Sequence, residues 1–140
     1  MKNFCFALLV SLSTTSFAAS QIEIKNAVIR LPPPGSTTTA MFMDIMNNDK
    51  VERTLEKVSG AISDDIELHE MAMTEGRMTM RNVPKILLKK GEHTLLKPGG
   101  LHIMIFNLKR PLKENEAIDM KMDFDRQEHV TIKAIVKKDL

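Results

Sequence analysis

The chain has 140 residues and a formal net charge of +2, so it has room for one ordinary domain with its own hydrophobic core. This charge is close to neutral, so it gives no electrostatic case for nucleic-acid binding. The chain contains no Trp and no Tyr, and three of its six Phe lie in the first 17 residues, so it has few aromatic faces on which bases or sugars could stack.

The first residues are typical of a secretory signal peptide. Lys2 gives a positive start, residues 4–12 are apolar, and the small residues Ala18-Ala19 follow at a suitable cleavage point. The apolar run is too short for a membrane span, which needs about 20 residues, so we prefer a signal peptide to a buried helix or a membrane anchor. We expect cleavage after Ala18, with Ala19 as the alternative, which makes 1–18 the signal and 19–140 an exported domain that is not embedded in the membrane.

Sulfur-containing side chains are distributed unusually. Cys5 is the only cysteine and lies in the expected signal, so the mature domain has no thiol for a disulfide, a thiolate metal site or a nucleophile. Of the eleven Met residues, ten remain after cleavage. Met is a flexible filler of hydrophobic cores, and it is also a soft neutral ligand that suits Cu(I). Composition alone leaves both uses open.

Beyond the signal, short runs with β-like alternation are separated by turn residues such as those in 31–35, 47–49 and 97–100. No window has a sustained helical period of 3.6 residues. This pattern predicts one all-β domain, an antiparallel Greek-key β-sandwich. The expected strands are, in chain order, residues 22–29, 39–46, 53–59, 66–73, 78–82, 86–88, 93–96, 101–108, 117–124 and 129–136.

A methionine-rich hairpin is the first candidate for chemistry. With Glu75-Gly76 as a two-residue loop, Met73 faces Met78, Met71 faces Met80, and His69 has Met80 as its diagonal neighbour. Diagonal neighbours lie about 7–8 Å apart, so long side chains can reach one ion between them. The opposite interpretation is a stripe of core methionines, which the pattern alone does not exclude.

A second His/Met pair follows in His102-Ile103-Met104, whose outer members point to one face of a strand. Two imidazoles and two thioethers do not suit Zn(II), which favours Cys, His and carboxylate, or Ca²⁺ and Mg²⁺, which favour oxygen. Soft neutral sulfur together with imidazole indicates Cu(I). The sequence therefore gives His69, Met80, His102 and Met104 as candidate Cu(I) ligands.

These four residues resemble the signature of the PCu(A)C-type periplasmic copper(I) chaperones, in which His, ten residues, Met, twenty-one residues and His-x-Met follow one another. The resemblance extends from about Ile24 to Ile135. It implies a cupredoxin-like β-sandwich that carries one Cu(I) on the four residues to a periplasmic acceptor, either the binuclear copper site of a respiratory oxidase subunit or a thioredoxin-like copper protein. The flanking segments that carry the resemblance are Glu67-Leu68-His69-Glu70-Met71, Met78-Thr79-Met80-Arg81, Leu96-Lys97-Pro98-Gly99-Gly100 and Leu108-Lys109-Arg110-Pro111-Leu112.

Other polar and sulfur residues receive plainer interpretations. Met71, Met73 and Met78 are expected to pack in the core or in the wall of the site, with a metal-capturing rim as the alternative. Glu70 alternates away from His69 and is not expected to be a ligand. The remaining residues are expected at the surface: His93, His129, the pairs Asp64-Asp65 and Asp123/Asp125, and the basic turn 109–113, which could alternatively dock an acidic partner.

Three functions compete at this point. The first is a copper chaperone that performs no turnover, and the second is a secreted β-sandwich that binds a partner without metal. The third, an enzyme, is not expected: the mature chain has no cysteine for thiol chemistry, and two thioethers disfavour the Cu(II) state that a copper oxidase needs.

Overall fold

The computed structural model describes residues 20–139, and the expected signal peptide lies outside them. Within this range the chain forms ten strands and one short 3-10 turn, η1 (Asp125–Gln127), so the all-β prediction is confirmed. The strands are β1 (Ile22–Arg30), β2 (Thr39–Asn47), β3 (Arg53–Gly60), β4 (Asp65–Thr74), β5 (Arg77–Asn82), β6 (Ile86–Leu88), β7 (His93–Leu96), β8 (His102–Phe106), β9 (Ala117–Phe124) and β10 (His129–Lys137). Each coincides with an expected strand, and β8 alone is clearly shorter than predicted. No helix in the described range is long and apolar enough to cross a bilayer.

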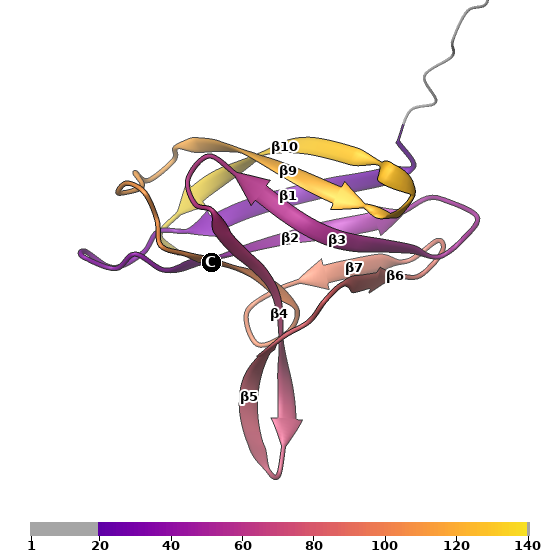
Figure 1. Ribbon diagram of the computed structural model, residues 1–140, viewed down its shortest axis with the longest axis horizontal. Helices are drawn as coiled ribbons and strands as arrows, with labels where there is room; N and C mark the ends of the chain where they lie inside the picture. Colours follow the sequence, from indigo (N-terminus) through magenta and orange to yellow (C-terminus); the bar gives the residue numbers. More distant parts are fainter. Residues whose placement is uncertain (1–19, 140) are drawn as a thin grey trace, which may run out of the picture.

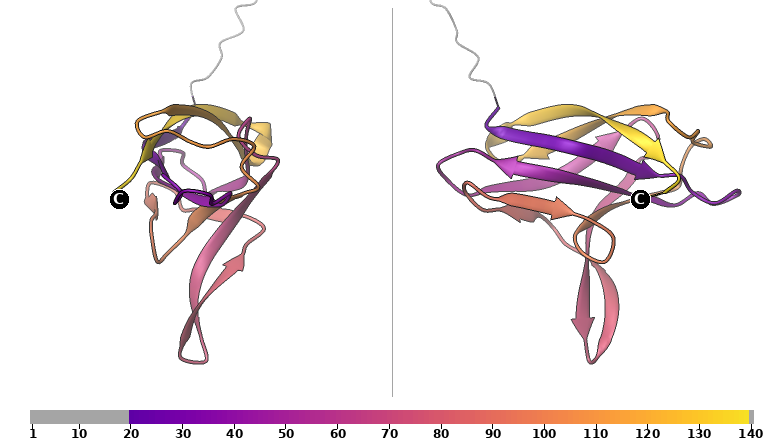
Figure 2. Two further views of the ribbon diagram at one scale, coloured as in Figure 1. Left: turned by 90° about the vertical axis from the view of Figure 1, so that its left-hand side faces the viewer. Right: turned by 180° about the vertical axis from the view of Figure 1, so that it is seen from behind.

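The strands form one sheet in the order β5-β4-β8-β2-β1-β10-β9-β3-β6, and β7 pairs with β2 beside β8. Figure 2 shows that the sheet curls round on itself, so strands lie on opposite sides of a common interior. Consecutive strands such as β2 and β3 lie far apart in this order, as the expected Greek-key sandwich requires.

One pairing departs from the antiparallel prediction. Strands β1 and β10 run parallel, with Val28 opposite Ile135, whereas the other named pairs among the described residues are antiparallel. A parallel pair needs a long connection, and here almost the whole domain connects the first strand to the last. The sheet is therefore mixed.

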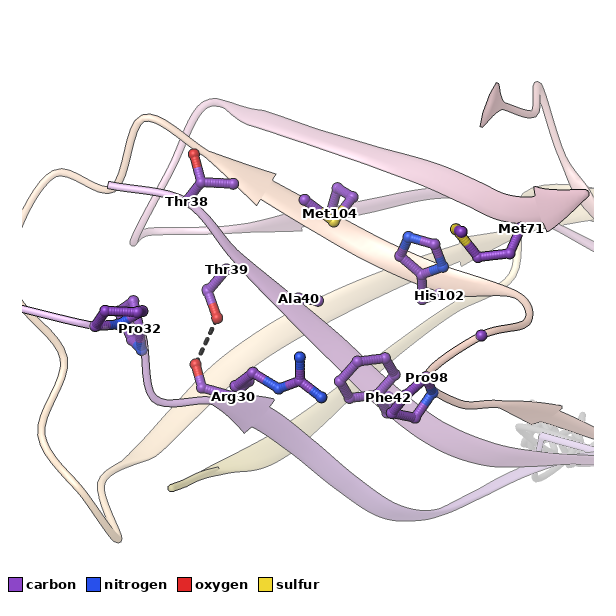
Figure 3. Close-up of a pocket in the computed structure, with 12 residues that line it drawn as sticks. Arg30, Pro32, Thr38, Thr39, Ala40, Phe42, Met71, Pro98, His102 and Met104 are labelled. Atoms are coloured by element: carbon purple, nitrogen blue, oxygen red, sulfur yellow. Dashed lines mark hydrogen bonds between the residues drawn. The ribbon is translucent and has the colours of Figure 1, made fainter. Parts of the chain in front are cut away.

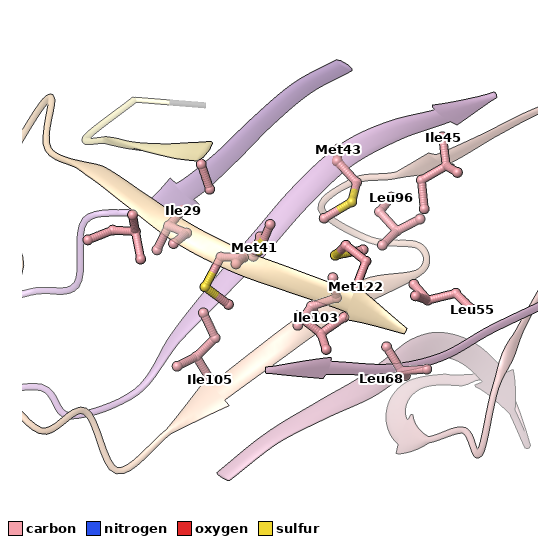
Figure 4. Close-up of a cluster of buried hydrophobic side chains, with 14 of the residues drawn as sticks. Ile29, Met41, Met43, Ile45, Leu55, Leu68, Leu96, Ile103, Ile105 and Met122 are labelled. Atoms are coloured by element: carbon pink, nitrogen blue, oxygen red, sulfur yellow. The ribbon is translucent and has the colours of Figure 1, made fainter. Parts of the chain in front are cut away.

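The core fills the inside of the curled sheet (Figure 4). Met41, Met43 and Ile45 alternate along β2 and are at most 2% exposed, which confirms the face predicted for them. Ile103 of β8 and Leu68 of β4 meet this cluster. Because side chains alternate, the residues next to these core positions must point to the outer face of the sheet.

Nine of the ten methionines in residues 20–139 divide between two environments. Met41, Met43, Met120 and Met122 are at most 2% exposed and act as core fillers. Five others lie on β4, β5 and β8, and Figure 1 shows that β4 and β5 form a hairpin that projects from the body of the domain. These five are Met71, Met73, Met78, Met80 and Met104.

Candidate functional site

Strand register brings the two predicted His/Met pairs together. The β4–β5 hairpin has the predicted pairing, with Met71 opposite Met80 and Met73 opposite Met78. Its loop residues Glu75 and Gly76 both have positive φ angles, as a tight two-residue hairpin loop requires. On the other side of β4, His69 lies opposite His102 of β8. The candidate residues thus share the outer face of three adjacent strands.

The His102 ring is fixed by its own backbone. Its Nδ1 lies 2.8 Å from the carbonyl oxygen of Gly100. Because a carbonyl can only accept, Nδ1 carries the proton and the Nε2 of the neutral ring has a free lone pair. This Nε2 lies 3.2 Å from the Sδ of Met80. Two electron-pair donors therefore face each other, which is an arrangement suited to a shared soft cation.

The His69 ring is oriented by the carboxylate of Glu67, through the ring nitrogen Nε2. Its Nε2 lies 2.7 Å from Oε2 of Glu67, and the side-chain amide of Asn82 donates to the same oxygen at 2.9 Å. The hydrogen bond with His69, followed by that from Asn82, lowers the pKa of Glu67, so this carboxylate is ionised and only accepts. The proton of His69 therefore sits on Nε2, and Nδ1 is left with a bare lone pair.

That Nδ1 has no partner. Among the described residues, it is the buried side-chain nitrogen or oxygen atom for which no hydrogen bond exists. Leaving a buried polar atom unsatisfied costs about 1–3 kcal/mol, so such an atom calls for an explanation, and an ion bound at the atom is one. The two imidazole rings lie 5.9 Å apart, centroid to centroid. The open lone pair of His69 and that of His102 are thus available in one small region.

Met104 completes the predicted set. It lies two residues after His102 on the same face of β8 and directly opposite Glu67. Together with His102 and Met71 it lines a groove of about 330 Å³ (Figure 3). Met71 therefore lies in the wall of a groove that His102 and Met104 also line.

The imidazoles are shielded and the thioether of Met80 is not. His69 and His102 are 7% and 5% exposed, whereas Met80 is 48% exposed. The centroid of the Phe42 ring lies 6.5 Å from that of the His102 ring, and the centroid of the Phe106 ring lies 6.0 Å from that of the His69 ring. An aromatic ring thus lies beside each imidazole, and the site is open on the Met80 side.

The candidate ligand atoms are nitrogens and sulfurs, and none is an oxygen. In residues 20–139 there is no cluster of three or more His, Cys, Asp and Glu side chains that could hold a metal. Two nitrogens and two sulfurs fit Cu(I) or Ag(I) better than Zn(II), Ca²⁺ or Mg²⁺. The chemistry of the residues present therefore fits the ion expected from sequence.

Sequence reasoning missed Glu67 and Asn82. The signal was available, because residues i and i+2 of a strand share a face, which places Glu67 beside His69. Glu70 points to the opposite face of β4, as expected, and pairs there with Arg81.

Two expectations about the methionines are wrong. Met73 and Met78 are 66% and 50% exposed, so they neither pack in the core nor form a closed wall. The reason is that β8 pairs with β4 only along Asp65–His69, so the second half of β4 has no neighbour on that side among the described strands. The hairpin therefore extends beyond the body that could have covered it.

The surface predictions mostly hold. His93 and His129 are largely exposed and pair with Asp44 and Asp123. Asp125 is the exception, because it is not simply a surface charge. It is 2.7 Å from the guanidinium of Arg53, whose side chain is only 3% exposed.

Comparison with known proteins gives one family and several similar folds. The model of a family described as "LpqE-like: Putative lipoprotein LpqE-like" matches residues 22–136. A curated relative, "Putative lipoprotein Lxx21020" of Leifsonia xyli subsp. xyli, is 27% identical over 115 residues, which cover 81% of this chain and 68% of that protein.

Two solved structures illustrate the fold. The copper-bound PCuAC domain from PmoF2 has a TM-score of 0.73 and 22% identity, with 86% of this chain and 96% of that chain covered. The CuI-DR1885 structure from Deinococcus radiodurans has a TM-score of 0.67 and 24% identity, with coverages of 91% and 85%. At these identities the likeness establishes a shared fold, and this fold is the one expected from the sequence.

Proposed function

The chain belongs to the LpqE-like family, and we propose that it is a copper chaperone that binds one Cu(I) ion and passes it to another protein. The observation that carries the proposal is the pair of free imidazole lone pairs. His69 Nδ1 is buried without a partner, and His102 Nε2 faces the Met80 sulfur at 3.2 Å. A soft cation between them would satisfy all three atoms.

In this proposal the cargo ion is held by His69 through Nδ1, by His102 through Nε2, and by the thioethers of Met80 and Met104. All four ligands are neutral, and two are soft sulfurs, so Cu(I) is preferred to Cu(II). Glu67 and the Gly100 carbonyl orient the two rings by holding their N–H groups, as partners of metal-bound histidines commonly do.

Two solved structures with this fold support the identity of the ion. One is described as copper-bound and the other as a CuI form. They do not bear on which residues of this chain hold the ion. The four residues proposed here depend instead on the local geometry and on the spacing of the His and Met residues.

The difference in solvent exposure between the histidine and methionine ligands suits transfer of the ion to another protein. The imidazoles are buried, and Met80 lies toward solvent. An acceptor with cysteine thiolates could therefore replace the Met80 thioether first, because a thiolate is a stronger soft ligand than a neutral thioether. The proposed acceptor is a periplasmic cuproprotein, either an oxidase subunit with a binuclear copper site or a thioredoxin-like copper protein.

The alternative is a secreted module that binds a partner without metal. The groove beside His102 favours this idea, because Pro32, Phe42 and Pro98 give it an apolar lining. Binding of a partner in this groove does not explain why the Nδ1 of His69 is buried without a hydrogen bond, and for this reason we prefer the copper proposal.

Competition for Cu(I) with a chromophoric chelator, under anaerobic conditions, tests the proposal. We expect one tight equivalent in the mature protein and a large loss in a His102→Ala, Met104→Ala double variant. A matched control is His93→Ala, Met46→Ala, which removes another His and Met that lie opposite each other on β2 and β7. No binding by the wild type would leave the module without metal, and equal binding by the wild type and the His102/Met104 variant would remove His102 and Met104 from the ligand set.

A further inference from the structure

The β4–β5 hairpin carries a row of thioethers, and of these the proposed site uses only Met80 as a ligand. In residues 20–139 the edge strand β5 pairs with β4 alone, and all six of its residues are exposed. Figures 1 and 2 show the hairpin standing away from the rest of the domain in each view. Side chains on this hairpin therefore lack the usual cover of a second layer.

The two faces of the hairpin differ sharply. On one face Met73 lies opposite Met78, and Met71 lies opposite Met80. The other face is polar: the hydroxyls of Thr74 and Thr79 are 3.1 Å apart, and Glu70 pairs with Arg81. The thioethers are therefore gathered on one side and not scattered.

Packing does not account for the outer pair. Met73 and Met78 are 66% and 50% exposed, and they belong to the small set of large apolar side chains that are exposed in the described part of the chain. Exposed large apolar side chains that lie together commonly mark a binding site. Here the grouped atoms are sulfurs, which point to a soft ligand.

The register allows two sulfurs to reach one ion. Residues directly opposite each other on antiparallel strands have Cβ atoms about 4.5–5.5 Å apart. Met has three flexible side-chain bonds, so the sulfurs of Met73 and Met78 can converge above the ribbon. Met71 is on the same face, two residues along β4, and can supply a third sulfur.

We propose that Met73, Met78 and Met71 form a second, weaker Cu(I) site made only of thioethers, from which the ion moves to the histidine site. The inference rests on the proposed function for the identity of the ion. The two sites are contiguous, because Met80 follows Met78 on the same face and its Sδ already contacts His102. The second site is weaker because it is solvent-exposed and lacks imidazole ligands, so the ion is driven toward the histidines.

Titration of [methyl-¹³C]methionine-labelled mature protein with Cu(I) beyond one equivalent, under anaerobic conditions, tests the inference. The first equivalent should shift the methyl signals of Met80 and Met104, and the second should shift those of Met73 and Met78. A Met73→Leu, Met78→Leu variant keeps the volume of the side chains and removes both sulfurs. The matched control, Thr74→Val, Thr79→Val, changes the polar face of the same hairpin.

We expect two equivalents in the wild type and in the threonine variant, and one in the leucine variant, with the second at least about tenfold weaker than the first. A leucine variant that still takes two equivalents, or a wild type that takes one, overturns the inference and leaves the proposed function intact. Conversely, if the His102→Ala, Met104→Ala variant keeps its tight equivalent while the leucine variant loses an ion, the hairpin site stands and the proposed histidine site fails.

Discussion

The Nε2 of His102 contacts the Sδ of Met80 at 3.2 Å, although the two residues come from strands that do not pair with each other. Strand β4 lies between them, so the Met80 side chain must cross the outer face of β4. Neighbouring strands are about 4.8 Å apart, and a long flexible side chain is needed to cover two such steps. This contact brings the methionine-rich β4–β5 hairpin and the His102-Ile103-Met104 motif of β8 into one candidate site.

Met80→Leu should therefore weaken Cu(I) binding while it leaves the stability of the fold almost unchanged. Leucine has a similar volume, and Met80 is about half exposed, so we expect the free energy of unfolding to change by less than about 0.5 kcal/mol. Loss of the sulfur should weaken Cu(I) binding by at least about tenfold, because losing a ligand should cost no less than losing a residue that orients one. Chelator competition and urea unfolding measure the two effects. Met46→Leu is the control, and an unchanged affinity in Met80→Leu would remove Met80 from the ligand set.

Glu67→Gln should weaken binding without removing any ligand. The carboxylate holds the Nε2–H of His69 and thereby leaves Nδ1 free. Loss of its charge makes His69 a poorer ligand and a less well-oriented one, and we expect about a 10- to 100-fold loss of Cu(I) affinity in chelator competition. Glu70→Gln, on the opposite face of the same strand, should bind like the wild type. Equal affinities for the two variants would mean that Glu67 does not orient the ligand.

The part of the site that the sequence predicts well is local. Alternation along each strand and a two-residue loop at Glu75-Gly76 set the hairpin register, and the structure has that register. The same rule places His102 and Met104 on one face. These features follow from neighbours in sequence, so no knowledge of the rest of the fold is needed.

The parts that the sequence predicts poorly depend on distant strands. Alternation shows that Met73 and Met78 share a face, but it does not show whether anything covers that face. The answer depends on where β8 stops pairing with β4, which happens at His69. The parallel pairing of β1 with β10 is likewise set by strands at opposite ends of the domain.

Arg53→Ala should destabilise the fold through a charge network that sequence reasoning did not identify. The Arg53 side chain is 3% exposed and contacts the carboxylates of Asp125 and Glu128 at 2.7 Å and that of Asp49 at 3.3 Å. Removing the buried partner leaves three carboxylates close together, and we expect a loss of about 3 kcal/mol in urea unfolding. Arg81→Ala, which breaks an exposed pair, should cost less than about 0.5 kcal/mol. A similar small cost for Arg53→Ala would show that the network contributes little.

Glu116 should make a pH-dependent contribution to stability. The hydrogen bonds from Arg110, and then that from the backbone N–H of Lys113, lower the pKa of Glu116 below its ordinary value of 4.5. A carboxyl whose pKa is lower in the folded state stabilises the protein fully above its unfolded pKa, and the contribution disappears as the pH falls through the folded pKa. The denaturation midpoint of the wild type should therefore exceed that of Glu116→Gln at pH 7, and the difference should shrink below about pH 4.5.

Urea midpoints measured for both proteins at several pH values from 7 down to 3 test this expectation. Glu114→Gln is the matched control, because Glu114 is an exposed acidic residue of the same turn. The difference in urea midpoint between the wild type and Glu114→Gln should not shrink at low pH in the way expected for Glu116→Gln. A difference between wild type and Glu116→Gln that stays constant down to pH 3 would mean that the Arg110–Glu116 pair does not contribute through the ionised carboxylate.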